Sequence, residues 1–185
     1  MKKANFSFSA IKRPFCRYLI MSGLEQYDVK ILAALTQSIA GRKDFFHWLL
    51  EGGYPELAAF SNAVRGDEEA MVWLFQNNYA WLAILSNAID GEVEARQWIS
   101  KACHPVNLIF ALACREDETA LRWLHERKLF IFMMMAKEVH QVLDTQAVEN
   151  AGPYTHKFGG NVRVVEAMQQ WMQQQKTNDS KTENQ

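Results

Sequence analysis

The sequence predicts an all-α fold, an αα-repeat solenoid of about five 25-residue helix-turn-helix units with helical caps. Two observations carry this prediction. Four of the six tryptophans, Trp48, Trp73, Trp98 and Trp123, stand 25 residues apart. Within each interval, apolar residues recur at spacings of three and four, the period of a helix that buries one face. Because a pair of such short helices cannot bury its own apolar surface, the units are expected to stack on one another.

The composition excludes two classes of protein. With 185 residues, 49% of them hydrophobic, and a net charge of -1, the chain does not resemble a disordered protein. No stretch approaches the 18 or so uninterrupted apolar residues that a transmembrane helix requires. The three cysteines, Cys16, Cys103 and Cys114, are odd in number and show no pairing motif, which favours a cytoplasmic location.

The first helix of each unit is marked by two apolar columns four positions apart. One column holds Leu35, Phe60, Leu85, Phe110 and Met135, and the other holds Ile39, Val64, Ile89, Cys114 and Val139. Pro55 and Pro105 suit the first turn of this helix, where a missing N–H costs nothing. Gly41, Gly66 and Gly91 follow its last apolar position, where a left-handed residue is expected.

The second helix of each unit begins with acidic residues, which are favourable beside its positive N-terminal end. It passes a small residue (Ala70, Ala95 or Ala120) and reaches a tryptophan followed by Leu or Ile. The pairs Gly52-Gly53 and Asn77-Asn78 end it. We interpret the tryptophans of this column as structural, because a ligand-stacking role does not require one in every layer.

The repeat divides the chain into four parts. We expect an N-terminal cap at 1–22 with a helix over 14–21, five αα repeats at 23–147, a C-terminal capping loop and helix at 148–175, and a disordered tail at 176–185.

The run AVRGDEEAMVWL at 63–74, echoed at 88–98, resembles the inner part of an ankyrin repeat. There a first helix ends in small residues, a glycine turns the chain, and a second helix ends in an apolar pair. The chain lacks the threonine-proline-leucine-histidine opening of that family, and 25 residues leave no room for its long β-hairpin loop. The resemblance therefore implies a degenerate, shortened ankyrin-like array, and a distinct αα-repeat family is the alternative. Either implies a binding scaffold, and no catalytic residues carry over.

The residues show no constellation for catalysis, a cofactor or a metal. Cys103, His104, Cys114 and His125 lack the spacing of a zinc site, and Cys114 occupies an apolar column. The acidic clusters recur once per unit at a helix start, so they have a local structural explanation. Gly159-Gly160 lacks the further glycines and the lysine of a phosphate loop. We therefore expect a protein that is not an enzyme.

The outward side of the first helices is the predicted partner-binding face. The polar residues on this outward side are followed by a contiguous stripe of apolar residues. A contiguous apolar stripe indicates an interface. Trp81 joins this set because it is a tryptophan outside the structural column. The candidates are Gln37, Asn62, Trp81, Ile84, Asn87, Ile109, Leu112 and Met134. Alternatively, the C-terminal helix around 168–172 folds back over the stripe and makes it part of the core.

The sequence thus predicts a non-catalytic protein-protein interaction scaffold that binds a protein partner along this face. A nucleic-acid-binding solenoid is the first alternative. Five basic residues precede the first acid, but residues 18–185 sum to -6, so phosphate contacts along the repeats are disfavoured. A small-molecule enzyme whose site is not visible in the sequence is the second alternative.

Overall fold

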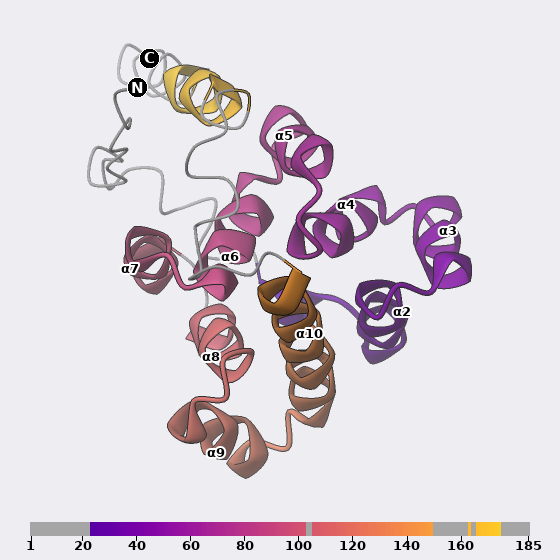
Figure 1. The fold of residues 1–185 in the computed structure, drawn as a ribbon, viewed down its shortest axis with the longest axis vertical. Coiled ribbons are helices and arrows are strands. Elements are labelled where there is room, and N and C mark those ends of the chain that lie inside the picture. The colour runs from indigo at the N-terminus through magenta and orange to yellow at the C-terminus, as the bar shows by residue number, and fades with distance from the viewer. Residues whose placement is uncertain (1–22, 103–104, 150–162, 164–165, 175–185) are drawn as a thin grey trace, which may run out of the picture.

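The computed structural model describes residues 23–102, 105–149, 163 and 166–174, and the regular elements among them are all helical (Figure 1). The all-α class is therefore confirmed. In chain order the elements are the 3-10 helix η3 (Leu24–Gln26) and the α-helices α2 (Val29–Ile39), α3 (Lys43–Glu51), α4 (Pro55–Val64), α5 (Glu68–Gln76), α6 (Ala80–Asp90), α7 (Val93–Ala102), α8 (Pro105–Ala113), α9 (Glu118–Glu126) and α10 (Phe130–Glu149). Residues 166–174 are also helical. The predicted cap at 1–22 and tail at 176–185 lie outside the described residues.

The helices begin where the sequence signals place them. Pro55 and Pro105 are the first residues of α4 and α8, as predicted. The side chain of Asp67 accepts hydrogen bonds from the backbone N–H groups of Glu69 (2.9 Å) and Ala70 (3.1 Å) at the start of α5. Asp117 caps α9 in the same way. These side chains satisfy N–H groups that have no partner within the helix.

A left-handed residue recurs at the turns that follow α2, α4, α6 and α8. Gly41, Gly66 and Gly91 have φ angles of 88°, 91° and 100°, which confirms their predicted role. Glu116 takes the corresponding position 25 residues after Gly91, with a φ of 60°. Since a residue with a Cβ atom pays about 1–2 kcal/mol for this conformation, the packing of that unit enforces the turn.

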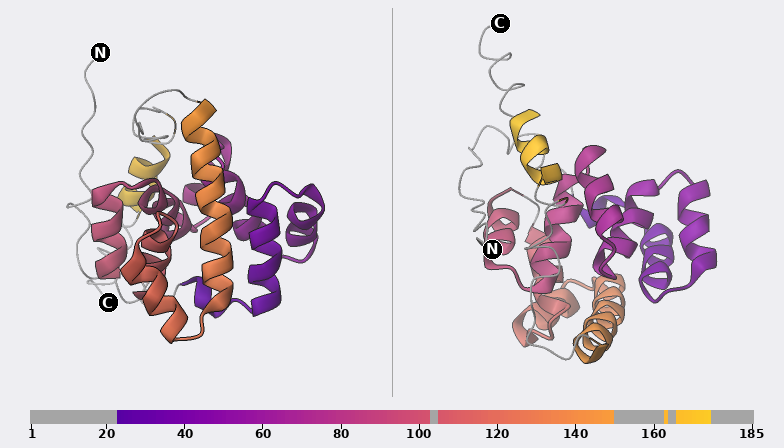
Figure 2. Two further views of the ribbon diagram at one scale, coloured as in Figure 1. Left: turned by 60° about the horizontal axis from the view of Figure 1, so that its bottom comes forward. Right: turned by 45° about the horizontal axis from the view of Figure 1, so that its top comes forward.

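The helices form two concentric sets, which we term the inner helices (α2, α4, α6, α8 and α10) and the outer helices (α3, α5, α7 and α9). Each inner helix packs against the next one, and α10 also packs against α2. Each outer helix packs against the inner helix before it and the inner helix after it. An open solenoid would keep its first and last units apart. Here they touch, and the inner helices close into a ring (Figures 1 and 2).

The apolar columns of the sequence form the core between these sets. The side chains of one column are fully buried in every unit: Leu35, Phe60, Leu85, Phe110 and Met135. Phe110 and Phe132 meet edge to face, with their ring centroids 5.9 Å apart. Because each inner helix packs against neighbouring inner and outer helices, the burial of these side chains depends on the helices on either side.

Arginine side chains join the ends of successive inner helices. The Arg65 guanidinium, just after α4, donates to the carbonyl of Ile39 at the end of α2 (3.1 Å). Arg115, just after α8, donates likewise to the carbonyls of Ile89 (3.5 Å) and Asp90 (3.3 Å) at the end of α6. The guanidinium groups thus act as caps at the C-terminal ends of these helices, where carbonyl groups lie beyond the helical hydrogen-bond pattern.

The N-terminal end of the described chain is bound to the inner helices by two hydrogen bonds. The buried Asn107 side chain accepts a bond from the N–H of Leu24 (3.2 Å), and Leu24 itself is fully buried. The Tyr27 hydroxyl donates to Oε1 of Glu56 (3.0 Å), whose side chain is buried at the start of α4. Asn107 departs from a column that otherwise holds leucine and phenylalanine, and this bond explains the departure.

Within the described part of the C-terminal region, residues 166–174 form a helix. At 166–174, Ala167, Met168 and Trp171 are buried. The Trp171 ring lies 6.2 Å from the ring of Phe75 on α5.

Among the described residues, no helix is long and apolar enough to cross a membrane.

Replacing Tyr27 with phenylalanine is expected to lower the free energy of unfolding by about 1–3 kcal/mol, because the buried Glu56 carboxylate loses its hydroxyl donor. Urea unfolding measures the change. Tyr54→Phe is the matched control: the Tyr54 ring lies 6.2 Å from that of Tyr27 and keeps that contact without its hydroxyl. Equal losses in the two variants would contradict the importance of the hydrogen bond.

Stability is also expected to fall at alkaline pH. Burial, and then the Glu56 carboxylate, raise the pKa of Tyr27 above its ordinary value. The unfolded chain therefore loses this proton first, so stability is complete below about pH 10 and falls above it, by up to about 1.4 kcal/mol per pH unit. Burial also raises the pKa of Tyr79, so Tyr27→Phe should reduce the slope without abolishing it. Unfolding curves between pH 9 and pH 11, roughly spanning this window, measure the slope, and an unchanged slope would contradict the assignment.

Candidate functional site

Two of the predicted partner-binding residues are not available at the surface. Trp81 is 4% exposed and Ile84 is 0% exposed, so their assignment to an outward face is wrong. Both lie on α6, which α4, α5, α7 and α8 surround. The helix is buried from Ala80 to Ser86 without interruption. A helix that is apolar all round is a buried helix, and this feature of the α6 sequence is the signal that the prediction missed.

The other predicted residues fall into two groups. Gln37 and Met134 line a groove between α2 and α10. Four others are half-buried on α4, α6 and α8 and do not line it: Asn62, Asn87, Ile109 and Leu112. The helix at 166–174 has its aromatic contact with the outer helix α5. The predicted face is therefore not one continuous surface.

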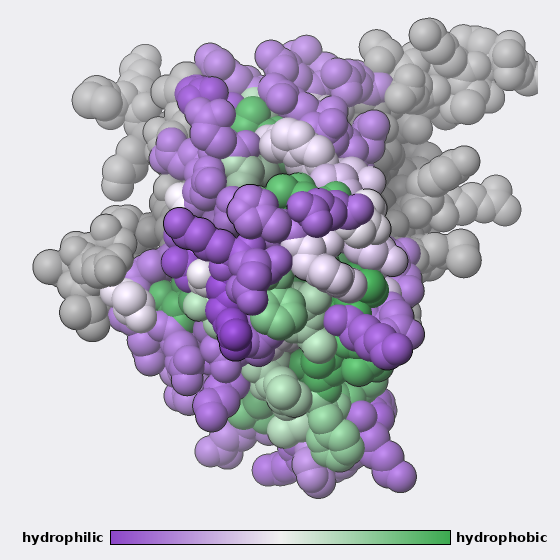
Figure 3. Space-filling model, turned by 90° about the vertical axis from the view of Figure 1, so that its right-hand side faces the viewer, coloured by the Kyte–Doolittle hydropathy of each residue, from purple (hydrophilic) through white to green (hydrophobic). Residues whose placement is uncertain are grey.

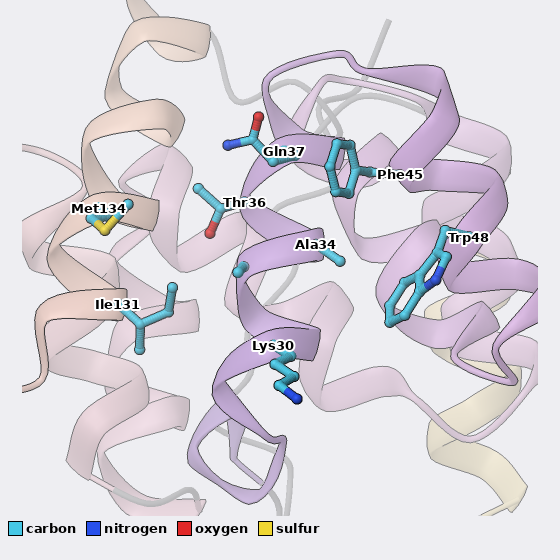
Figure 4. A pocket seen from close by; sticks show the side chains of 9 residues that line it. Lys30, Ala34, Thr36, Gln37, Phe45, Trp48, Ile131 and Met134 are labelled. Atoms are coloured by element: carbon cyan, nitrogen blue, oxygen red, sulfur yellow. The ribbon is translucent and has the colours of Figure 1, made fainter.

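The groove is formed by three helices that the ring closure brings together. It has a volume of about 400 Å³ and lies across α2, with α3 on one side and α10 on the other (Figure 4). Ala33 and Ala34 of α2 line its floor. The small side chains of these alanines leave the helix surface open to close approach. The remaining lining residues are Lys30, Thr36, Gln37, Phe45, Trp48, Ile131 and Met134.

Large apolar side chains form the two walls of the groove. Phe45 and Trp48 belong to α3, whereas Ile131 and Met134 belong to α10 (Figure 4). Trp48 is 47% exposed and Met134 is 59% exposed. On this side of the molecule, hydrophobic side chains gather in the lower half of the surface (Figure 3). Contiguous exposed apolar surfaces are a common feature of binding sites.

The polar groups of the groove lie at its two ends. Lys30 stands beside Trp48 at one end, and Gln37 stands beside Phe45 at the other (Figure 4). The Arg42 guanidinium donates to Oε1 of Gln37 (3.2 Å) and lies 5.3 Å from the centre of the Phe45 ring. The middle of the groove is therefore apolar, and both ends carry positive charge.

Phe45 and Trp48 are the site residues that the sequence prediction omitted. The sequence places Trp48 in the structural tryptophan column, yet Trp48 is 47% exposed, whereas Trp98 of the same column is 6% exposed. Phe45 stands in the column that holds alanine in the three following units, at Ala70, Ala95 and Ala120. A large residue at a position that is otherwise small is the signal that marks this unit as different.

The buried ionisable groups among the described residues have structural roles. The Glu56 carboxylate binds the Tyr27 hydroxyl, as described above. Burial raises the pKa of the Cys114 thiol, which keeps it protonated and unreactive. In the part of the chain that the structure describes, no three His, Cys, Asp or Glu residues lie close enough together to hold a metal ion. Cys103 and His104 lie outside that part.

Comparison of the chain with family models, with curated proteins and with solved structures finds no match. The function is therefore inferred from the groove itself.

Two tryptophans should differ in their effect on stability. Trp81→Ala is expected to lower the free energy of unfolding by about 3–5 kcal/mol, because it leaves a cavity in the core. Trp48→Ala should cost roughly 1 kcal/mol or less, because its side chain is half exposed at the groove. Urea unfolding of both variants measures the difference. A larger loss from Trp48→Ala would show that Trp48 belongs to the core.

Proposed function

We propose that the protein is a non-catalytic protein-protein interaction module that binds its partner in the groove between α2, α3 and α10. One observation carries the proposal: the groove exposes Trp48 and Met134 around an apolar floor. Tryptophan is enriched among the side chains that contribute most to binding. Methionine adapts its shape to an incoming surface. The proposed binding face is thus smaller than the stripe along all the first helices that the sequence predicts.

The chemistry of the groove supports binding rather than catalysis. Lys30 is the one titratable side chain among the residues that line it. General acid-base chemistry requires a proton donor or acceptor whose pKa suits the reaction, commonly a pair with separated pKa values. Aromatic, aliphatic and methionine side chains instead stabilise a complex by removing apolar surface from water. Burying one such side chain fully contributes about 1.5–3 kcal/mol.

The scaffold is part of the same proposal. We treat the helix pairs as αα repeats, either as a shortened ankyrin-like array or as a distinct repeat family. The regular alternation of inner and outer helices supports this view. A cytoplasmic location also belongs to the proposal, and the buried free thiol of Cys114 is compatible with a reducing compartment.

A photo-reactive amino acid at position 134 tests the proposed function. Met134 is exposed in the groove, so irradiation in a native cell extract is expected to link the chain to a defined protein. The matched control carries the same amino acid at Val93, which is 63% exposed on α7 and does not line the groove. Products are separated by mass and identified by mass spectrometry. A protein linked at position 134 and lost when Ala33 is replaced with Glu supports the function. The same products at both positions would overturn it.

A further inference from the structure

The groove lies at the junction of two inner helices that has no outer helix among the described residues. At the other junctions of the ring, α3, α5, α7 and α9 each pack against both inner helices. The outer helices lie around the perimeter of the ring (Figure 1). In the space between α9 and α3, no outer helix of the described residues covers the junction of α10 with α2. The junction of α10 with α2 is where the groove opens. The repeat therefore shows what kind of element covers such a junction, namely a short helix with one apolar face.

The outer helices also define the orientation of that element. The groove extends along α2 from Lys30 to Gln37 (Figure 4). The chain of α3 runs in the opposite direction, so Trp48 lies beside Lys30 and Phe45 lies beside Gln37. An outer helix is thus antiparallel to the inner helix that precedes it, as the tight turn between them requires. A helix in the groove in the same orientation would place its C-terminal end near Lys30. That end carries partial negative charge, which the ammonium group stabilises.

Resting on the proposed function, we propose that the groove binds an amphipathic α-helix of a partner protein, antiparallel to α2, in the position of an outer helix. The outer helix α5 illustrates the chemistry that fits. Its buried side is formed by Ala70, Met71, Leu74 and Phe75. Its first turn carries Glu68 and Glu69. In this orientation the acidic first turn of the bound helix lies at the end of the groove where Gln37 and Arg42 meet.

Basic side chains at that end match an acidic helix start. Arg42 is exposed and its guanidinium binds Gln37. Lys137 is exposed on α10, three positions after Met134, and so on the same side of that helix. Asp44 on α3 and Glu138 on α10 carry the opposite charge and do not line the groove, so Lys30 at one end and the Gln37-bound Arg42 at the other set the orientation of the bound helix, while the apolar walls supply the affinity.

A synthetic probe tests this inference on the full chain. The probe is a fluorescently labelled peptide that carries the sequence of residues 67–77 between alanine-rich ends, about 17 residues in all, so that it forms a helix. Fluorescence anisotropy is expected to show saturable binding to the wild-type protein. A second peptide, with serine in place of Met71, Leu74 and Phe75, is expected not to bind. A third, with lysine in place of Glu68 and Glu69, is expected to bind more weakly, and Arg42→Glu should reverse that preference.

Variants of the protein locate the binding. Ala33→Glu and Met134→Glu place a charge in the groove at exposed positions and are expected to weaken binding about tenfold or more. The matched control, Val93→Glu, makes the same kind of change at an exposed position of α7 and should bind normally. Circular dichroism confirms that each variant is folded. No binding by the wild type, or equal binding by all variants, would overturn the inference.

Two other occupants are distinguished by measurements on the protein alone. Light scattering that shows a dimer for the wild type and a monomer for Met134→Glu would assign the groove to a second copy. Cross-links from position 134 to residues 1–22 of the same chain would assign it to that segment. Either result overturns the partner-helix inference.

If the peptide fails to bind while position 134 still captures a specific protein from extract, the proposed function stands and only the helical form of the partner is wrong.

Discussion

The packing of α10 against α2 is the contact on which the rest of the structure depends. A pair of ten-residue helices cannot bury its own apolar faces, so each unit requires a neighbour on either side. The first and last inner helices would each lack one neighbour in an open array, and their mutual contact supplies it. The length of α10 assists closure, since the Gln146 side chain near its end donates to the carbonyl of Val64 at the end of α4 (3.5 Å). The same closure brings together the three helices that form the groove.

The residues that depart from the repeat columns mark the places where the units cease to be equivalent. Asn107 replaces an apolar residue and binds the N–H of Leu24, which attaches the N-terminal end of the described chain to α8. Phe45 replaces a small residue and forms a wall of the groove. Glu116 replaces a glycine and retains the left-handed turn at some conformational cost. The residues that follow the repeat columns therefore identify the scaffold. The residues that depart from these columns identify the ends of the ring and the groove.

The candidate site was predictable from the sequence only in part. Gln37 and Met134 were identified because they stand on the outward side of their own helices, and the structure places both in the groove. Ile84 occupies the same helical position as Met134, yet neighbouring helices cover it completely. Helical periodicity describes which side of a helix a residue occupies, but it does not describe what lies opposite that side. The groove also joins helices that are about one hundred residues apart in the chain, a contact that a 25-residue period does not encode.

The sequence by itself determined the all-α class, the alternating helices from α2 to α9 and the positions of their turns, but not η3 or the 20-residue length of α10. These features follow from local rules: apolar spacing, prolines in first turns, acidic caps and left-handed glycines. The tertiary structure alone decided that the ring closes, that Trp81 is buried while Trp48 is exposed, and that an apolar groove lies beside α2. The reason is that burial is a property of the neighbours a side chain meets. For Trp81 those neighbours are the helices around α6, and for the groove they come from helices far apart in the chain, α2 and α3 on one side and α10 on the other.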